Sequence, residues 1–259
     1  MQAVAAAPMS SILTDAWRTI APTKKDSDGP LPPLLLALTV VTGLVDAFSY
    51  LSLGHVFVAN MTGNVVFLAF ALAGAGGFSV LASLAAIGAF SAGALLGGRL
   101  ASSVGHDRGR LVVIVGVLEA LFVAVAVVVV TAVHAPGAGA ARYALIVILS
   151  VAMGAQNAMA RALAVPDLTT TVLTLTITGI SADSRWAGGA GSKAGRRLVS
   201  ALSMFVGALI GAFLVLKVSR IGAVLVALCV LGVIVLVATV VSRPETPWVG
   251  GVTEKRGCS

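Results

Sequence analysis

VFVANMTGNVV, residues 56–66, interrupts a strongly apolar part of the chain with Asn60, Thr62, Gly63 and Asn64. A looser copy, VPDLTTTVLT, follows at residues 165–174. When Thr62 is aligned with Thr169, Asn60 falls on Asp167. Irregular backbone at membrane depth is tolerated only where protein or water satisfies its polar groups, so both stretches should face the interior of the protein. They predict two polar breaks in the membrane, one in each half of an internally repeated chain.

The composition around these breaks is typical of an integral membrane protein. Hydrophobic residues make up 58% of the 259 residues and charged residues only 10%, and the mean hydropathy is +1.05. Such a chain is too apolar to be a soluble globule. The basic residues behind the net charge of +7 lie in short loops between apolar runs, as the positive-inside rule expects, so no nucleic-acid partner is predicted. The two cysteines and the absence of a recognised catalytic motif predict no enzyme, cofactor or metal site.

Six apolar runs are long enough to cross a bilayer, since a span needs about 20 residues. Two shorter segments, 64–75 and 169–182, follow the polar breaks. At ~1.5 Å per residue, the first of these would be only about 18 Å long, less than the ~30 Å hydrocarbon core. We therefore predict an all-α integral membrane protein with about six full transmembrane helices and two short or broken helices. The six runs are 34–53, 78–98, 111–133, 143–163, 198–216 and 221–242.

Two basic loops bear on whether the short segments cross the membrane. One holds Arg99, Arg108 and Arg110, and the other holds Arg185, Lys193, Arg196 and Arg197. If the segment 169–182 dips into the membrane and returns to the side it left, both loops face the cytoplasm, in agreement with the positive-inside rule. The same treatment of 64–75 gives six spans with both termini inside. The alternative is an eight-span protein.

Further motifs recur in the same order as the polar breaks. Gly43-x-x-Asp46-Ala47 returns as Gly154-x-x-Asn157-Ala158, and Gly93-Ala-Leu-Leu-Gly97 returns as Gly207-Ala-Leu-Ile-Gly211. Three crossings per repeat would invert the second copy relative to the first, as in many secondary transporters. We predict a polar arm at 1–33, membrane repeats at 34–133 and 134–242, and a polar tail at 243–259. The glycine pairs predict close helix packing, and their faces are candidates for contact between copies in a homo-oligomer.

Polar residues in the predicted spans and breaks are the candidates for a binding site. A charge inside a span costs about 2.5–3.5 kcal/mol on insertion scales, so Asp46 is predicted to bind a proton or cation, the alternative being a neutral side chain bonded to a neighbouring helix. Glu119 either joins this site or pairs with Arg99 or Arg110. Helix N-termini meeting at the bilayer centre would favour an anionic or strongly polar guest, although the same side chains also suit helix capping. The candidate residues are Asp46, Asn60, Thr62, Asn64, Glu119, Gln156, Asn157, Asp167, Thr169, Thr170 and Thr171.

The chain resembles the YoaK-like family of bacterial multipass inner-membrane proteins, a family of unknown function. The resemblance rests on GLVDAFSYLSLGHVFVANMTGNVV at 43–66, on GAQNAMAR at 154–161 and on the threonines at 169–171, and it extends over roughly residues 34–242. It implies a multipass protein of the bacterial inner membrane, but neither a substrate nor an activity.

Together these features predict a small-solute transporter or permease with a polar site near the bilayer midplane and with Asp46 as the candidate coupling residue. A channel would need no coupling residue. A membrane scaffold or regulatory subunit would instead use its glycine faces to bind a partner helix. The expected partners are the lipid bilayer and an unknown small solute, and the N-terminus is expected in the cytoplasm.

Overall fold

The computed structural model describes residues 9–23, 26, 28–133, 138–165, 168, 178 and 194–242. Within these ranges six helices are long and apolar enough to cross a membrane, which confirms the predicted number of spans. One shorter apolar helix of 12 residues begins inside the first polar break, at Met61, so it starts and ends three residues earlier than the predicted segment 64–75. The helices are α1 (Met9–Ile20), α2 (Leu31–Ser52), α3 (Met61–Leu72), α4 (Val80–Val104), α5 (Arg108–Ala132), α6 (Gly139–Leu163), α8 (Ala194–Phe213), which a π-helical turn η2 (Leu214–Val218) extends, and α9 (Arg220–Val241).

Local sequence signals explain where several of these helices begin. α2 starts with Pro32 and Pro33 in its first turn, where a missing N–H costs no helical hydrogen bond. The side chain of Ser79 accepts a hydrogen bond from the Ala82 N–H at the start of α4. The Asp107 carboxylate does the same for the Arg110 N–H at the start of α5, with a distance of 2.8 Å.

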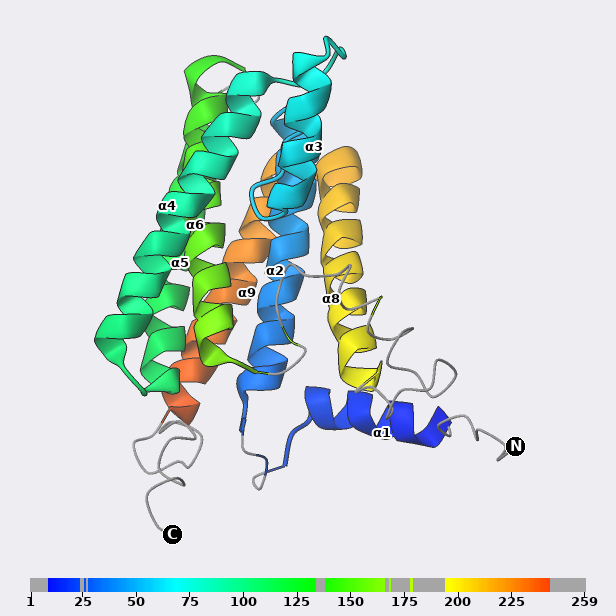
Figure 1. Ribbon diagram of the computed structural model, residues 1–259, viewed down its shortest axis with the longest axis vertical. Helices are drawn as coiled ribbons and strands as arrows, with labels where there is room; N and C mark the ends of the chain where they lie inside the picture. The colour runs from blue at the N-terminus through cyan, green and yellow to red at the C-terminus, as the bar shows by residue number, and fades with distance from the viewer. Residues whose placement is uncertain are drawn as a thin grey trace.

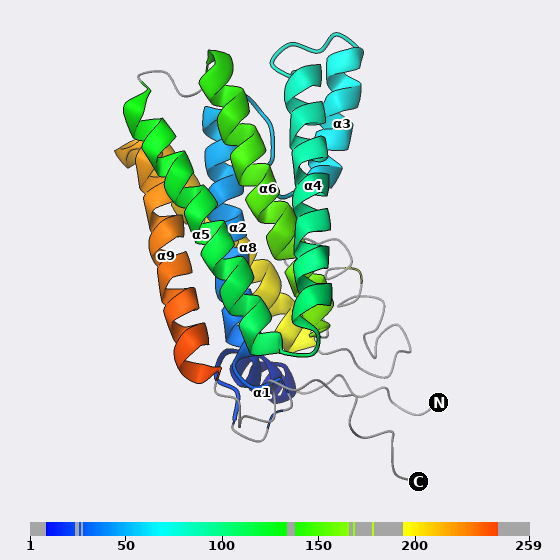
Figure 2. The same cartoon turned by 90° about the vertical axis from the view of Figure 1, so that its left-hand side faces the viewer.

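The six long helices alternate in direction along the chain. α2, α5 and α8 run away from the end where α1 lies, and α4, α6 and α9 run toward it (Figures 1 and 2). In the predicted repeat α2 corresponds to α6, α4 to α8 and α5 to α9, so each helix runs opposite to its counterpart. α2 and α6 are also the most buried spans, at 72% and 61% against at most 33% for the others. The helix directions therefore agree with an inverted repeat, which itself stays a prediction, and the first helix of each predicted repeat lies at the centre of the bundle.

Glycine contacts join the two repeats. Gly93 of α4 lies against the backbone of Val151 in α6, and a Cβ atom at Gly93 would come within 2.0 Å of the Val151 carbonyl oxygen. Gly207 of α8 lies in the same way against Val40 of α2, at 2.2 Å. Each glycine helix thus packs on the first helix of the other repeat. These glycine faces are therefore occupied within the chain. A contact between copies would have to use other surfaces.

Parts of both basic loops lie at the same end of the bundle, beside α1 (Figure 1). Arg108, at the start of α5, is 3.4 Å from the Asp28 carboxylate, and Arg196, at the start of α8, is 3.9 Å from the same side chain. α6 ends and α8 begins at this end, so the chain between them returns to the side it left. This is the six-span topology; the segment 169–182 itself lies outside the described residues, Thr178 excepted.

The polar arm contains a helix that the sequence analysis did not predict. α1 lies across the end of the bundle (Figure 1) and exposes Leu13, Trp17 and Ile20 along one stripe. Its other side packs on α8, where the Asp15 carboxylate accepts a hydrogen bond from the Arg196 N–H at 3.1 Å. The spacing of four and three residues between the apolar side chains is the helical signal that was available in the sequence.

Candidate functional site

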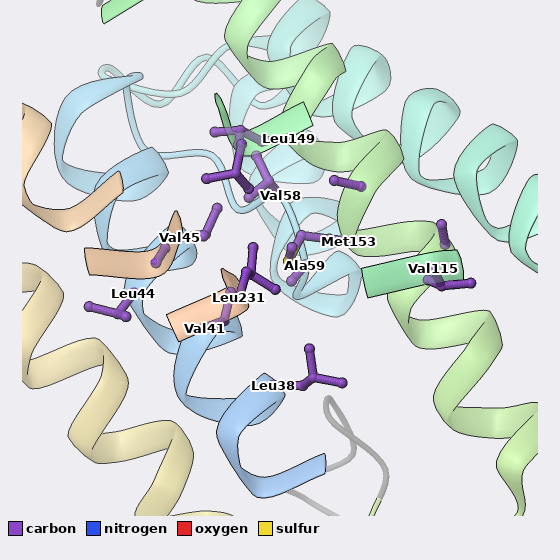
Figure 3. Packing of buried hydrophobic residues seen from close by; sticks show 14 of the residues in the cluster. Leu38, Val41, Leu44, Val45, Val58, Ala59, Val115, Leu149, Met153 and Leu231 are labelled. Carbon is purple, nitrogen blue, oxygen red and sulfur yellow. The ribbon is translucent and has the colours of Figure 1, made fainter. Parts of the chain in front are cut away.

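The segment between α2 and α3, residues 53–60, re-enters the bundle and forms the centre of the candidate site. Gly54 and His55 both have positive φ angles, of 84° and 56°, where the chain reverses. The segment then leads back toward the middle of α2, and α3 rises from there to the end that α2 reached (Figure 1). Val58 and Ala59 are buried among core side chains that include Leu149 and Met153 of α6 (Figure 3). Irregular backbone therefore lies inside the protein at residues 53–60, whereas the second part of the predicted break, from Met61, is helical.

Asp46 holds this re-entrant segment from α2. Its side chain is 3% exposed, and Oδ1 accepts hydrogen bonds from the N–H groups of Val58 and Ala59, both at 2.9 Å. Oδ2 accepts a third from Asn60 Nδ2 at 2.5 Å. Two of these bonds satisfy the backbone N–H groups of Val58 and Ala59, which lie outside any helix. Asp46 thus anchors the re-entrant segment to α2.

Asn64 holds the same segment from α3. The side chain is fully buried, and it pairs with both backbone groups of Phe57. Oδ1 accepts from the Phe57 N–H at 2.9 Å, and Nδ2 donates to the Phe57 carbonyl at 2.7 Å. The adjacent Gly63 leaves room for the Phe57 ring, since a Cβ atom there would lie 2.6 Å from it. The Gly-Asn pair at 63–64 therefore serves the packing of the re-entrant segment on the first turn of α3.

The electrostatics near the start of α3 differ from the sequence expectation of an anionic guest. The partial positive charge at a helix N-terminus attracts anions. Here the Asp46 carboxylate already accepts hydrogen bonds from residues 58–60, immediately before Met61. These donors are therefore already bonded to Asp46, and the expectation of an anionic guest finds no support at this break.

A second buried polar group links three helices. The amide of Gln156 in α6 lies between Thr42 of α2 and Glu119 of α5, and all three side chains are at most 1% exposed. One amide atom is 3.0 Å from Thr42 Oγ1, and the other is 2.7 Å and 3.2 Å from the two carboxyl oxygens of Glu119. Arg99 and Arg110, the alternative partners of Glu119, are both exposed. Glu119 thus belongs to the core of the bundle, and Gln156 is its hydrogen-bonding neighbour.

The other predicted site residues have different positions. Asn157 is half-buried and donates from Nδ2 to the Met153 carbonyl at 2.8 Å. Thr62 is exposed on the first turn of α3 and does not join the buried groups. Asp167, Thr169, Thr170 and Thr171 lie outside the described residues, so the second polar break stays a prediction.

Thr42 is the core residue that the sequence analysis missed. It is a threonine inside an apolar helix, and such a hydroxyl usually bonds to its own preceding turn, as this one does to the Leu38 carbonyl at 3.0 Å. A usable signal was its spacing of four residues from Asp46, which puts both side chains on one face of α2. Arg142 of α6 was also missed; it donates to the Gly54 carbonyl at 3.2 Å and so secures the reversal of the chain.

A polar cavity of about 220 Å³ lies at the α1 end of the bundle. None of the predicted site residues lines it. Across the described ranges, no three His, Cys, Asp or Glu side chains gather where they could hold a metal ion. The cavity is lined by Asp15, Arg18, Pro22, Asp26, Asp28, Pro32 and Arg196.

Comparison with known proteins places the chain among membrane proteins of undefined function. The family described as "Protein of unknown function (DUF1275)" matches residues 34–237. The UPF0700 transmembrane protein YoaK of Bacillus subtilis (strain 168) is 31% identical over 150 residues, which are 58% of this chain. The chain spans 65% of the length of that relative. No solved structure matches.

Proposed function

The chain belongs to the DUF1275 family of multipass membrane proteins, and we propose that it is a permease for a small solute, with the re-entrant segment and the side chains that hold it as the polar centre. The solute crosses without chemical conversion. The polar groups at the re-entrant segment come from Asp46, Asn60 and Asn64. Those on the facing helices come from Gln156 and Glu119.

The observation that carries this proposal is an irregular polar segment fixed at depth inside an inverted-repeat bundle. Breaks of this kind are costly in a membrane, because each unsatisfied backbone group costs several kcal/mol. Secondary transporters place their substrate and ion sites at such breaks, near the midplane and at the interface between repeats. In this chain the break between α2 and α3 adjoins α6, the first helix of the other repeat, through Val58, Leu149 and Met153 (Figure 3).

Asp46 is the proposed coupling residue. It accepts three hydrogen bonds from the re-entrant segment, so a change in its charge alters the bonds that hold this segment against α2. Protonation or cation binding at the carboxylate would weaken its acceptance of those N–H groups. The re-entrant segment is therefore the proposed mobile element, and Asp46 is its control.

The proposed location is the bacterial inner membrane, with both termini and α1 on the cytoplasmic side. α4 ends and α5 and α8 begin at the α1 end (Figure 1), and these helix ends carry Arg99, Arg108, Arg110 and Arg196, as the positive-inside rule expects of the cytoplasmic end. Single cysteines at exposed positions would test this orientation in a background in which both native cysteines are replaced by serine. A membrane-impermeant maleimide should label Gly76→Cys in intact spheroplasts, but Ser102→Cys only after permeabilisation. The reverse pattern would contradict the orientation.

Transport is tested with purified protein in liposomes. Isotonic gradients of amino acids, sugars, polyols, monocarboxylates and ammonium are applied in turn, and swelling is followed by stopped-flow light scattering. We expect at least one solute to enter faster than in protein-free liposomes, and Asp46→Ala and Asn64→Ala to slow that entry. Ser91→Ala, an exposed change on α4, is the matched control and should leave the rate unchanged. Folded protein that admits none of these solutes would contradict the proposal.

The Asp46→Asn variant separates a coupled permease from a channel. Asparagine keeps an oxygen that can accept from Val58 and Ala59, but it cannot change its charge. A channel would keep its full flux in this variant, whereas a coupled permease would lose accumulation against a gradient.

A scaffold that binds a partner helix through its glycine faces has less support, since Gly93 and Gly207 are buried within the chain.

A further inference from the structure

Glu119 carries a carboxyl group in α5 that is 1% exposed. The helices packed on α5 are α4, α6 and α9, whose ionisable residues are Arg99, Arg142, Tyr143, Arg161, Arg220 and Cys229. Arg99, Arg161, Arg220 and Cys229 are exposed, and Arg142 and Tyr143 lie about 20 Å along α6 from Gln156 at ~1.5 Å per residue. The polar group that meets the carboxyl is therefore a neutral amide, which can either donate or accept a hydrogen bond.

Both orientations of the Gln156 amide complete a chain of hydrogen bonds, but each requires a different state of Glu119. In the first, Nε2 donates to the carboxylate at 2.7 and 3.2 Å, and the Thr42 hydroxyl donates to the amide oxygen at 3.0 Å. In the second, Nε2 donates to Thr42 Oγ1 at 3.0 Å, and Thr42 donates to the Leu38 carbonyl, also at 3.0 Å. The amide oxygen then faces Glu119 at 2.7 Å, a distance at which a carboxyl O–H donates.

We propose that Glu119 is a proton-binding site and that the Gln156 amide reverses its orientation when the proton binds or leaves. A proton from the aqueous phase forms the O–H bond of Glu119, and this O–H donates to the amide oxygen. The amide turns by half a rotation, and the Thr42 hydroxyl hydrogen moves from the amide oxygen to the Leu38 carbonyl. On release the proton returns to water and the steps reverse, with no other covalent bond changed.

The consequence is that α2 senses the protonation of a residue on α5. Thr42 lies one helical turn from Asp46 on the same face of α2, and Asp46 anchors the re-entrant segment. Joined to the permease proposal, on which this step rests, the site makes the proton the coupling ion. The proton site itself can be measured without any solute.

The test uses isotope labels that the composition makes selective. The chain has three glutamates, Glu119, Glu245 and Glu254, and two glutamines, Gln2 and Gln156. Replacement of Glu245, Glu254 and Gln2 by alanine leaves one ¹³C-carboxyl glutamate and one ¹⁵N-amide glutamine. Solid-state NMR spectra of this protein in bilayers are recorded over the pH range in which it stays folded. We expect the Glu119 carboxyl and Gln156 amide signals to move together with one common midpoint.

Three results would overturn the proposal. The Glu119 signal could stay constant over the whole range, or it could titrate while the Gln156 signal does not move. The third is loss of the transition in Asp46→Asn, which would assign the proton to Asp46. In Glu119→Gln, which imitates the protonated acid and adds a second labelled amide, neither amide signal should move with pH. If that variant does not fold, the labelled protein that keeps both Glu119 and Gln156 is still a sufficient test.

The outcomes also separate this proposal from the permease proposal. Protein that moves a solute in liposomes but shows no common titration contradicts the proton site alone. Protein that shows the titration but moves no solute contradicts the permease alone.

Discussion

Replacement of Gly93 by alanine tests the packing that joins the two repeats. The new Cβ atom would lie 2.0 Å from the Val151 carbonyl oxygen, and 2.7 and 2.8 Å from the carbonyl carbon and Cα of that residue. Ordinary van der Waals contact begins near 3.4 Å. All three atoms belong to the backbone of α6, so no side chain can turn aside. α4 and α6 must therefore separate by about 1 Å or more, and overpacking of this kind costs about 1–3 kcal/mol.

Gly98→Ala is the matched control on the same helix. No heavy atom lies within 4 Å of the position that its Cβ would take. Alanine favours a helix over glycine by about 0.5–1 kcal/mol, and this gain is common to both variants. The difference between them therefore isolates the contact with Val151. The comparison is repeated in the other half of the chain. A Cβ atom at Gly207 would lie 2.2 Å from the Val40 carbonyl oxygen, whereas no heavy atom lies within 4 Å of a Cβ atom at Gly232, so Gly207→Ala is compared with Gly232→Ala.

The free energy of unfolding is measured by SDS titration of the purified protein in mixed micelles, with far-UV circular dichroism as the signal. We expect Gly93→Ala to be about 1–3 kcal/mol less stable than Gly98→Ala, and Gly207→Ala to be less stable than Gly232→Ala by a similar amount. Equal stability of Gly93→Ala and Gly98→Ala would refute the close contact of α4 with α6, and with it the way in which the repeats are joined.

Three further variants test the contacts of the site and of the α1 end in the same unfolding assay. Asn64→Ala leaves the N–H and carbonyl of Phe57 without partners, and at about 1–3 kcal/mol for each buried group it should cost about 2–6 kcal/mol; a loss below 1 kcal/mol would count against the anchoring role of Asn64. Asp46→Asn keeps an acceptor for two backbone donors and should be clearly more stable than Asp46→Ala, so equal stability would contradict the anchor at Asp46. Asp28→Asn weakens partly exposed pairs with Arg108 and Arg196, so the cost should be under about 1 kcal/mol and should shrink in high salt; a large cost that is independent of salt would argue against a screened ion pair.

The number of spans was predictable, because membrane thickness fixes the length of an apolar run. The recurrence of Gly93 and Gly97 as Gly207 and Gly211 marked equivalent helices, and the basic loops indicated which segments return to the side they left. The partners of those glycines were not predictable. Each pair packs on the first helix of the other repeat, a long-range contact that a repeated pattern alone does not specify.

The candidate site, too, could be predicted from the sequence only in part. A polar break that must turn inward was readable at Asn60 and Asn64, since membrane burial leaves such backbone no other partner. The choice of partner was not readable for Glu119, where charge favoured Arg99 or Arg110 but the fold places the amide of Gln156 beside it. Thr42 gave almost no signal, because its hydroxyl also bonds within its own helix. Residues 169–171 stay a prediction.

The depth of the start of α3 in the bilayer tests most directly whether the segment before it re-enters the membrane. Spin labels are placed at Thr62 and at Gly76, both exposed, in protein whose native cysteines are replaced by serine. Their depths follow from collision rates with oxygen and with a polar nickel complex. The 12 residues of α3 at ~1.5 Å each predict that the Thr62 label lies about 15–20 Å deeper than the Gly76 label. Labels at equal depth would mean that α3 lies along the membrane surface, and no polar centre could then form inside the bundle.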